Sequence, residues 1–286
     1  MGPDPISNNH GKHLFMEEKR RRSVEAYLNE AFLGSASARP LRILSEYLEP
    51  KSRFDHYQID DTIVFMGSAR LIAREQAETE LQQTERDGGD IERARQRLAM
   101  SRYYEAAREL ARRVTDWSKA LGDQDRRFVV CTGGGPGIME AANRGASEAK
   151  GMNVGLTISI PIEEFDNRYT TRELSFHFHY FFMRKFWFAY LAKALIVFPG
   201  GFGTLDELFE VLTLLQTRKM SKHLLVVLFG TQYWDEVINF EALIRHGTIN
   251  REDLKLFHRT DSLDEAFEII TRHLREYALA ERGAIL

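Results

Sequence analysis

The chain has 286 residues, of which 43% are hydrophobic and 28% charged, as in an ordinary soluble globular protein. Its net charge of −3 provides no general basic field for a nucleic acid, and no apolar stretch reaches the roughly 20 residues that a membrane helix needs. The single cysteine, Cys131, excludes an intramolecular disulfide, so we expect a cytoplasmic protein without a secretory signal.

The N-terminal part of the chain predicts an accessory helical layer. Residues 1–16 are expected to form a disordered tail. A helical extension is expected over residues 17–58. From about Glu17 to Leu48, apolar positions at helical spacing are interrupted near Gly34 to Pro40, which predicts two helices with a linker. The main domain is expected to span residues 59–286, with a helical excursion over residues 72–121.

The main domain predicts a Rossmann-like, doubly wound α/β fold with a mainly parallel sheet. The expected strands are Thr62–Met66, Phe128–Thr132, Asn153–Ile160, Ser175–Phe178, Leu195–Phe198, Leu224–Phe229 and one near Leu256–Phe257. The expected helices are Met100–Leu121, Met139–Lys150, Met183–Lys193, Thr204–Thr217, Trp234–Ile244 and Leu263–Leu279. Because helices separate the strands, we expect right-handed crossovers, with helices on both faces of the sheet. Ligands of such sheets bind beyond the carboxyl ends of the strands.

The most informative segment is a glycine-rich turn that follows the apolar run Ala194 to Phe198. It reads Pro199-Gly200-Gly201-Phe202-Gly203-Thr204-Leu205-Asp206-Glu207 and leads into a predicted helix. Glycines let the backbone turn its amides toward a ligand, and a helix N-terminus adds unpaired N–H groups and a positive dipole end. The segment therefore predicts an anion site. The alternative is a tight turn with a well-capped helix, in which Thr204 is the N-cap and Glu207 the third helical residue.

A second turn of the same kind follows the apolar run Val129 to Thr132. It reads Gly133-Gly134-Gly135-Pro136-Gly137-Ile138-Met139-Glu140 and leads into another predicted helix. Two such loops predict two walls of one site at the ligand-binding edge of the sheet. Neither loop is accompanied by the acidic ribose ligand of a dinucleotide fold or by the lysine of a nucleoside triphosphatase, so a smaller phosphate-bearing ligand is favoured.

Together these motifs resemble the LOG ("Lonely guy") family. The resemblance depends on Met183-Arg184-Lys185, on the Pro-Gly-Gly-x-Gly-Thr-x-x-Glu motif that ends at Glu207, and on the second glycine loop, and it covers about residues 60–245. LOG proteins are phosphoribohydrolases that act on cytokinin riboside monophosphates and AMP, although they have often been labelled lysine decarboxylases. Nothing in this sequence supports a pyridoxal phosphate site, and the resemblance implies no cofactor.

The resemblance implies hydrolysis of the N-glycosidic bond of a nucleoside 5′-monophosphate to free base and ribose 5-phosphate. Glu207 would stabilise the oxocarbenium ion that develops on the ribose, orient its hydroxyls or activate water, and the sequence leaves these roles open. Arg184 would bind phosphate or sugar beside the carboxylate, the alternative being a surface helix arginine held against aromatic neighbours. The other implied substrate-binding residues are Gly200, Gly201, Gly203, Thr204, Gly134, Gly135, Gly137, Met183 and Lys185.

Further residues near the expected strand ends carry weaker signals. Ser68 and Arg70 follow the first strand and are expected to contact ribose or phosphate, unless Arg70 pairs with an acidic neighbour. His177 and His179 alternate on a strand and so share a face, but two ligands do not make a metal site, and core or dimer packing is favoured; no metal is expected. The aromatic stretch Tyr180 to Met183 departs from the shorter plant-type LOG members, which puts a cytokinin preference in doubt.

Three functional readings follow from these residues. The first is an enzyme, a nucleotide phosphoribohydrolase. The second is a module of the same superfold that binds a nucleotide or a phosphorylated cofactor without turnover. The third, a DNA-handling protein, is opposed by the acidic net charge. The resemblance also implies a homodimer or higher homo-oligomer, and the N-terminal helices and residues 72–97 would cover the site, extend a dimer interface or alter base selectivity.

Overall fold

The computed structural model describes residues 23–122, 127–159, 167–280 and 283. The tail predicted for residues 1–16 and the end of the strand expected at Ile160 lie outside these residues. The described chain divides after Arg42 into two compact units, which are taken in turn.

The first unit consists of short helices. A 3₁₀ helix, Ala26–Leu28, precedes α1 (Glu30–Leu33), and the Asn29 side chain caps α1 by accepting a hydrogen bond from Phe32 N at 3.1 Å. After another 3₁₀ turn, Ala36–Ala38, α2 (Arg39–His56) begins here and continues into the second unit. Helices therefore precede β1, as expected, but α1 has only four residues and α2 begins at Arg39, within the predicted linker.

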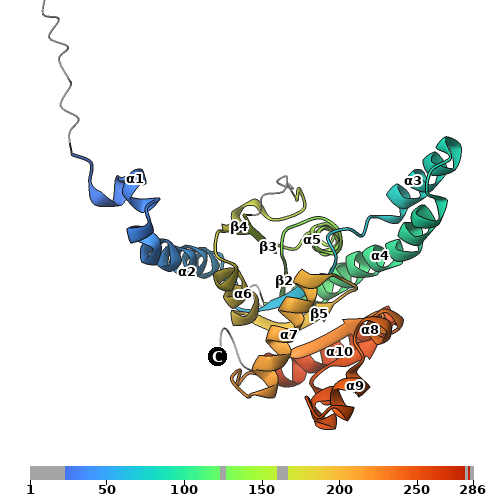
Figure 1. The fold of residues 1–286 in the computed structure, drawn as a ribbon. Coiled ribbons are helices and arrows are strands. Elements are labelled where there is room, and N and C mark those ends of the chain that lie inside the picture. The colour runs from blue at the N-terminus through green and yellow to red at the C-terminus, as the bar shows by residue number, and fades with distance from the viewer. Residues whose placement is uncertain (1–22, 123–126, 160–166, 281–282, 284–286) are drawn as a thin grey trace, which may run out of the picture. The chain divides into compact units, whose positions relative to one another are not determined.

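The second unit contains a seven-stranded sheet in which each strand runs parallel to its neighbours (Figure 1). The strands are β1 Thr62–Met66, β2 Val129–Thr132, β3 Asn153–Ile158, β4 Ser175–Phe178, β5 Ala192–Val197, β6 Leu225–Phe229 and β7 His258–Thr260. Their order is β4-β3-β2-β1-β5-β6-β7. This arrangement confirms the predicted Rossmann-like α/β fold with extra N-terminal helices.

Helices cover both faces of the sheet. The helices that follow α2 are α3 Arg74–Asp87, α4 Ile91–Ala120, α5 Ile138–Glu148, α6 Phe181–Tyr190, α7 Phe202–Gln216, α8 Thr231–Val237, α9 Phe240–Arg245 and α10 Leu263–His273, which continues as a π-helical turn, Leu274–Ala278. Short 3₁₀ helices occur at Arg172–Leu174 and Arg251–Leu256. The α3–α4 hairpin projects beyond the sheet in Figure 1. Among the described residues, none of the helices has the length and apolar content that crossing a membrane requires.

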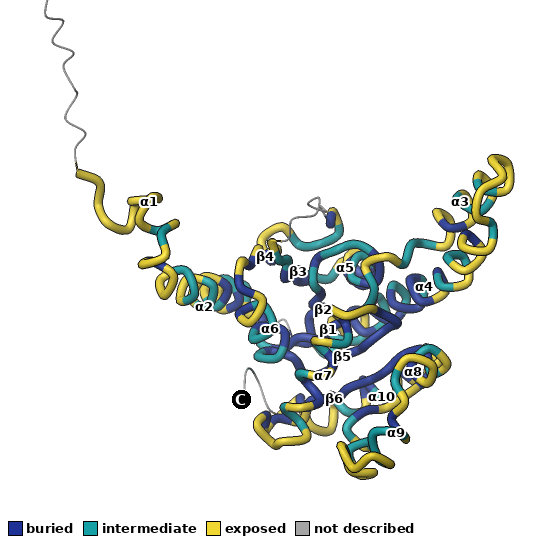
Figure 2. Tube along the Cα trace, viewed as in Figure 1, coloured by how far each residue is buried: buried dark blue, intermediate teal, exposed yellow. Residues whose placement is uncertain are grey.

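Successive residues of a strand pack alternately into two hydrophobic cores, one on each face of the sheet. In β1, Ile63 and Phe65 pack in the core shared with α4, α5 and α10, whereas Val64 and Met66 pack in the core shared with α6, α7 and the end of α2. This period of two is expected of a strand that is covered on both faces. In Figure 2 the central strands β1, β2, β5 and β6 are buried throughout, whereas the edge strands β4 and β7 include exposed residues.

Several predicted elements differ from the structure. The helix expected over Met183–Lys193 ends at Tyr190, and Ala192 and Lys193 belong to β5. The helix expected from Met100 begins at Ile91, because the Asp90 side chain caps it by accepting a hydrogen bond from Arg93 N at 3.0 Å. The single helix expected over Trp234–Ile244 is two helices, because Ile238 adopts an extended backbone and ends α8. The strand expected near Leu256–Phe257 is present as β7 but starts at His258, because Leu256 ends the preceding 3₁₀ helix.

The strand order places three loops at one point. The chain runs outward from β1 through β2 and β3 to β4, then returns to the other side of β1 as β5. At such a reversal the loops that follow neighbouring strands diverge and leave a crevice at the carboxyl edge of the sheet. The loops after β1, β2 and β5 therefore frame the expected ligand position.

Candidate functional site

Backbone hydrogen bonds join the three loops at the reversal of strand order. Ser68 N, after β1, donates to Pro199 O, after β5, at 2.9 Å. Ile138 N, at the start of α5, donates to Ser68 O at 3.1 Å. Gly137 has a φ of +74°, and a Cβ at this position would lie 2.2 Å from Ser68 O, so only glycine permits this approach. The two glycine-rich turns are thus brought together, with the β1 loop between them.

The first glycine loop opens directly into α7. This helix begins at Phe202, two residues earlier than expected, and Gly201 is its N-cap. Thr204 is therefore not the N-cap, and the alternative that makes it one is wrong. The first backbone bond of the helix runs from Leu205 N to Gly201 O at 3.0 Å, which leaves the N–H groups of Phe202, Gly203 and Thr204 ahead of the helical ladder.

Space beside this helix terminus is open. A Cβ placed on Gly201 or Gly203 would meet no atom within 4 Å, so the protein itself does not require glycine there. Gly200 differs, because a Cβ would lie 2.2 Å from Oγ1 of the buried Thr204. Gly200 is therefore packed against Thr204, whereas no side chain covers the main chain at Gly201 and Gly203.

Arg184 and Glu207 form an ion pair between α6 and α7. Arg184 NH2 lies 2.8 Å from Glu207 Oε1, and the two side chains are only 12% and 14% exposed. Arg184 NH1 also lies 3.8 Å from the position that a Cβ on Gly133 would occupy, so the pair adjoins the second glycine loop. Arg184 Nε is buried and has no hydrogen-bond partner among the described residues. One donor of the guanidinium is thus unpaired in the described interior of the protein.

Burial shifts both members of the pair toward their neutral forms. Desolvation raises the pKa of Glu207 to about 7, although the nearby Arg184 guanidinium opposes the shift. Desolvation also lowers the pKa of Arg184, which nevertheless stays charged because its ordinary value exceeds 12. Near neutral pH the Glu207 carboxyl is therefore poised between its two protonation states.

Buried polar side chains support the second glycine loop. Thr132 Oγ1 accepts a hydrogen bond from Gly134 N at 2.9 Å and donates to Asn143 Oδ1 at 2.6 Å. Asn143 Nδ2 in turn donates to Asn153 Oδ1 at 2.8 Å. Gly134 has a φ of +67°, and a Cβ there would lie 2.5 Å from a Thr157 methyl group. Side chains of β2, α5 and β3 thus hold this loop in a conformation that favours glycine.

Other residues that were predicted to bind substrate lie less centrally. Met183 is 9% exposed and packs in the core. Lys185 Nζ forms ion pairs with Asp206 at 2.7 Å and Glu210 at 3.0 Å, both on α7. Ser68 Oγ accepts a hydrogen bond from the backbone N–H of Arg70, which is an exposed residue. Their substrate contacts remain predictions.

Two supporting residues were not foreseen from the sequence. Tyr233, on α8, donates a hydrogen bond to Gly200 O at 2.7 Å and so steadies the first glycine loop. Glu46, on α2, accepts hydrogen bonds from His179 N at 2.7 Å and Tyr180 N at 3.2 Å, directly before the helix that carries Arg184. No sequence signal connects Glu46 or Tyr233 with the glycine motifs, because each contact joins distant segments.

The neighbouring histidines do not assemble a metal site. His177 Nε2 lies 2.6 Å from Ser159 Oγ, and its Nδ1 lies 3.0 Å from Thr157 Oγ1, so both ring nitrogens already have hydroxyl partners. Within the part of the chain that the structure describes, no group of three or more His, Cys, Asp or Glu side chains is arranged to hold a metal ion.

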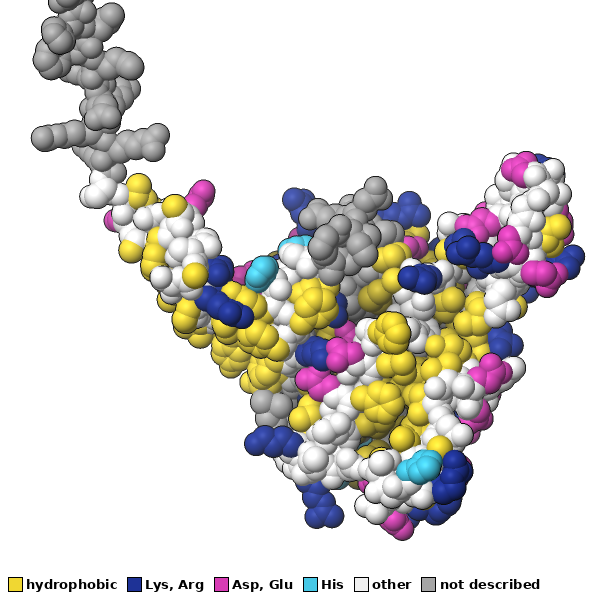
Figure 3. All heavy atoms as spheres, in the orientation of Figure 1, with side chains coloured by type: hydrophobic (Ala, Val, Ile, Leu, Met, Phe, Trp, Pro, Cys, Tyr) yellow, Lys and Arg dark blue, Asp and Glu magenta, His cyan; other side chains and the backbone are white. Residues whose placement is uncertain are grey.

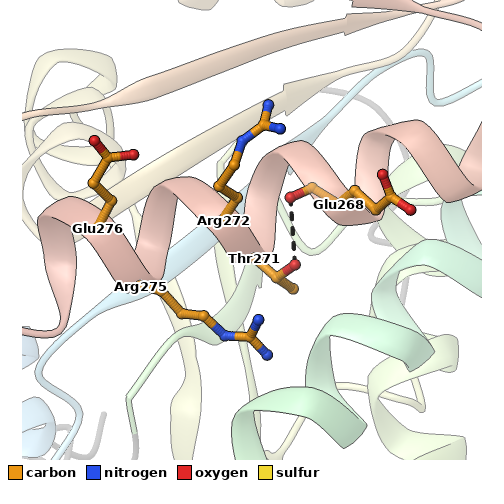
Figure 4. A pocket seen from close by; sticks show the side chains of 5 residues that line it. All are labelled: Glu268, Thr271, Arg272, Arg275 and Glu276. Atoms are coloured by element: carbon orange, nitrogen blue, oxygen red, sulfur yellow. Dashed lines mark hydrogen bonds between the residues drawn. The ribbon is translucent and has the colours of Figure 1, made fainter.

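A surface hollow of about 540 Å³ lies elsewhere, along α10 and its π-helical continuation (Figure 4). Its lining residues are Glu268, Thr271, Arg272, Arg275 and Glu276. All of them come from one helical segment, and none belongs to the strand-end cluster. The chemistry suggested by the motifs is therefore not located in this hollow.

Comparison with known proteins supports the motif assignment. The profile of a family described as "Possible lysine decarboxylase" matches residues 139–271, a range that includes Arg184 and Glu207. A search among curated proteins finds no significant match.

Three solved structures resemble the chain at low similarity. The X-ray structure of TM1055, a structural genomics target, is 20% identical, covers 74% of this chain and 99% of that chain, and has a TM-score of 0.46. A molybdenum cofactor carrier protein from Chlamydomonas reinhardtii is 16% identical, covers 75% and 98%, and has a TM-score of 0.40. A molybdenum cofactor binding protein from the phototrophic bacterium Rippkaea orientalis is 15% identical, covers 75% and 95%, and has a TM-score of 0.41.

The family match and the motifs agree with each other. The matched range contains the glycine-rich start of α7 and the Arg184–Glu207 ion pair, whereas the second glycine loop, residues 133–137, precedes it. Residues 139–271 of this chain therefore match the family described as possible lysine decarboxylase.

Proposed function

We propose that this protein hydrolyses the N-glycosidic bond of a nucleoside 5′-monophosphate, either AMP or a cytokinin riboside monophosphate, and releases the free base and ribose 5-phosphate. The observation that carries the proposal is the buried Arg184–Glu207 pair beside an open, glycine-rich helix terminus. The helix terminus offers an anion site, and burial raises the pKa of the Glu207 carboxyl group. Shifted pKa values of this kind are typical of catalytic residues.

The start of α7 would bind the 5′-phosphate. The N–H groups of Phe202, Gly203 and Thr204 precede the helical ladder, and the helix dipole adds positive potential at the same end. The bare surface at Gly201 and Gly203 lets phosphate oxygens approach the main chain closely.

Glu207 would act on the sugar. As the base departs, positive charge develops at the anomeric carbon, and an ionised carboxylate in a desolvated position stabilises that charge more than it stabilises the neutral ground state. The same carboxylate could also accept a proton from attacking water. Either role requires the ionised form of Glu207, whose pKa is raised to about 7 by burial.

Arg184 would hold both the ligand and the carboxylate. Its NH2 group already binds Glu207, while its Nε has no partner among the described residues. A ribose hydroxyl or a phosphate oxygen that accepts from Nε would satisfy this buried donor. Binding of substrate would thereby fix the sugar beside Glu207.

An activity assay tests this proposal. The full chain is incubated at pH 8 with AMP, GMP, CMP, IMP and isopentenyladenosine monophosphate in turn, and free base and ribose 5-phosphate are quantified by chromatography. We expect equimolar release of the two products from at least one adenine nucleotide. Absence of both products from all five nucleotides over several hours, with folded protein, would rule out the hydrolase.

The second candidate is a protein that binds a nucleotide or a phosphorylated cofactor without turnover. Mutual pairing of Arg184 and Glu207 favours it, because a pair that persists in the complex would bind the ligand and leave the anomeric carbon untouched. A ligand that raises the melting temperature but yields no product would support this candidate. Lysine decarboxylation is not proposed, because Lys185, which is adjacent to Arg184, is held by two carboxylates.

We also propose a cytoplasmic homodimer or higher homo-oligomer without a nucleic-acid or membrane partner. On the face drawn in Figure 3, acidic and basic side chains are intermingled, and apolar side chains gather beside the segment that Figure 1 labels α7. Leu44 and Leu48, one turn apart on α2, are 50% and 52% exposed and provide an apolar surface for a second copy. Light scattering after gel filtration tests the oligomeric state.

A further inference from the structure

The proposed site accounts for the phosphate and the sugar of a nucleotide but not for its base. A purine or pyrimidine is flat and aromatic, and proteins commonly receive such a base on the face of an aromatic side chain. The receiving ring has to adjoin the Arg184–Glu207 pair and keep an accessible face. Identification of the ring that receives the base rests on the proposed function.

Phe181 meets both conditions. It is the first residue of α6 and is 52% exposed. Its ring centroid lies 5.3 Å from Arg184 Cζ, and that guanidinium is bonded to Glu207. The ring therefore adjoins the ion pair, while about half of its surface remains exposed to solvent.

Neighbouring phenylalanines do not meet both conditions. Phe188 also contacts the Arg184 guanidinium, with 5.4 Å between its centroid and Cζ, but it is only 4% exposed. Phe182 is 51% exposed, but its ring packs on Tyr180, with 5.5 Å between the centroids. Phe202 is 93% exposed, but it is the first residue of α7 and so stands at the phosphate end of the site.

We propose that Phe181 is the residue on which the nucleobase stacks, and that the site therefore selects nucleoside monophosphates, purines above pyrimidines, over bare sugar phosphates. The larger face of a bicyclic purine covers more of the ring than a pyrimidine does. Stacking on Phe181 also keeps the base next to Arg184, so the anomeric carbon that links base and ribose lies toward Glu207. Base preference in this chain would thus come from the aromatic stretch that precedes Arg184.

Equilibrium binding separates this inference from the proposed function. AMP, CMP and ribose 5-phosphate are titrated by calorimetry into the full chain carrying Glu207→Gln, which prevents turnover. The same titrations are repeated after adding Phe181→Ala, Phe181→Trp or the matched control Phe182→Ala, which removes an equally exposed ring one position away. Because Phe181 is half exposed, its replacement should leave the fold intact, and circular dichroism checks this for each variant.

The expected result is selective. Phe181→Ala should weaken AMP binding about tenfold or more, weaken CMP binding less, and leave ribose 5-phosphate binding unchanged. Phe181→Trp should retain AMP binding, and Phe182→Ala should change none of the three affinities. Equal effects of Phe181→Ala on AMP and ribose 5-phosphate, or no effect on AMP, would overturn the stacking role and leave the proposed function standing. Failure of both the unaltered protein and the Glu207→Gln parent to bind AMP or ribose 5-phosphate would overturn the stacking role and the proposed function together.

Discussion

At the residue scale, the site combines two groups that burial destabilises in their charged forms. Glu207 and Arg184 are each less than 15% exposed and lie 2.8 Å apart. Each charge is tolerated because the other is present, and removal of one partner leaves the other buried and unpaired. A ligand that accepts a hydrogen bond from Arg184 Nε and donates hydroxyl hydrogen bonds to Glu207 would stabilise both buried charges. Ligand binding and the ionisation of Glu207 are therefore expected to be coupled.

The raised pKa of Glu207 sets the expected pH dependence. Because the proposed reaction requires the ionised carboxylate, kcat/KM should increase with pH through about 7 and level off above pH 8. At pH 6 only about a tenth of the carboxyl would be ionised, so the rate should be about tenfold below the plateau. Steady-state kinetics from pH 5.5 to 9 check this, with circular dichroism at each pH as the control. A rate that falls across the same range would assign Glu207 the role of a proton donor instead.

Two glycines of the site should respond differently to alanine. Gly203→Ala meets no atom within 4 Å and should keep or raise the free energy of unfolding, by about 0.5 kcal/mol, yet block phosphate from the main chain. Gly137→Ala combines a φ of +74° with a 2.2 Å contact to Ser68 O, so it should lower the free energy of unfolding by at least about 1–2 kcal/mol. Urea unfolding and AMP titration distinguish them. Unchanged AMP affinity in Gly203→Ala would argue against the phosphate position.

At the element scale, hydrogen bonds to α2 hold the start of α6 in position. The Glu46 carboxylate receives two backbone N–H groups ahead of α6, and the Trp187 indole donates to Glu46 O at 2.9 Å. Arg53, further along α2, donates to Ser175 O at 3.0 Å and lies over the Phe176 ring. The part of α2 that belongs to the second unit is therefore joined to the helix that carries Arg184.

Glu46→Ala should loosen the start of α6. Loss of the two hydrogen bonds should lower the free energy of unfolding by about 1–2 kcal/mol and weaken AMP binding, because Arg184 is four residues from Tyr180. Glu49→Ala is the matched control on the same helix, since it removes only a surface ion pair with Arg53. Thermal unfolding and AMP titration of both variants test the role of α2. Equal behaviour of the two variants would refute it.

At the scale of the whole molecule, the carboxyl ends and the amino ends of the strands carry different groups of residues. The carboxyl edge carries the glycine loops and the ion pair, whereas the opposite edge contains a buried charge cluster. There Arg127 Nε lies 2.5 Å from Asp61 Oδ2, and Lys193 Nζ lies 3.6 Å from Asp61 Oδ1. Arg127 also donates to Leu279 O at 2.9 Å, which ties the end of the last helix to the sheet.

Asp61→Ala should therefore affect stability and spare ligand binding. Two buried cations would lose their counterion, and the expected loss is about 3–5 kcal/mol in the free energy of unfolding. Glu241→Ala, which breaks a well-exposed pair with Arg251, should change it by less than about 1 kcal/mol. Urea unfolding measures both, and AMP affinity below the unfolding transition should match that of the unaltered protein. A large loss of affinity in Asp61→Ala would show that the two edges are coupled.

The parts of the site that were predicted from sequence are those whose signals are local. A glycine cluster after an apolar strand predicts a ligand loop by itself, and both loops lie where they were expected. The start of α7 was misplaced because its N-cap is a glycine and its first residues are Phe and Gly, which carry no capping signal. Glu46, Asn143 and Tyr233 could not be assigned, because each acts on a loop or helix from a distant point of the chain.

We expect the buried Glu207 carboxylate, beside the main-chain phosphate site at the start of α7, to cleave the N-glycosidic bond of a nucleotide. The most direct measurement compares adenine release from AMP at pH 8 by the unaltered protein and by Glu207→Gln, with AMP affinity and melting temperature determined for both. We predict that the variant still folds and binds AMP but releases adenine at least about a hundredfold more slowly. Adenine release at the same rate by both proteins would contradict a catalytic role for Glu207.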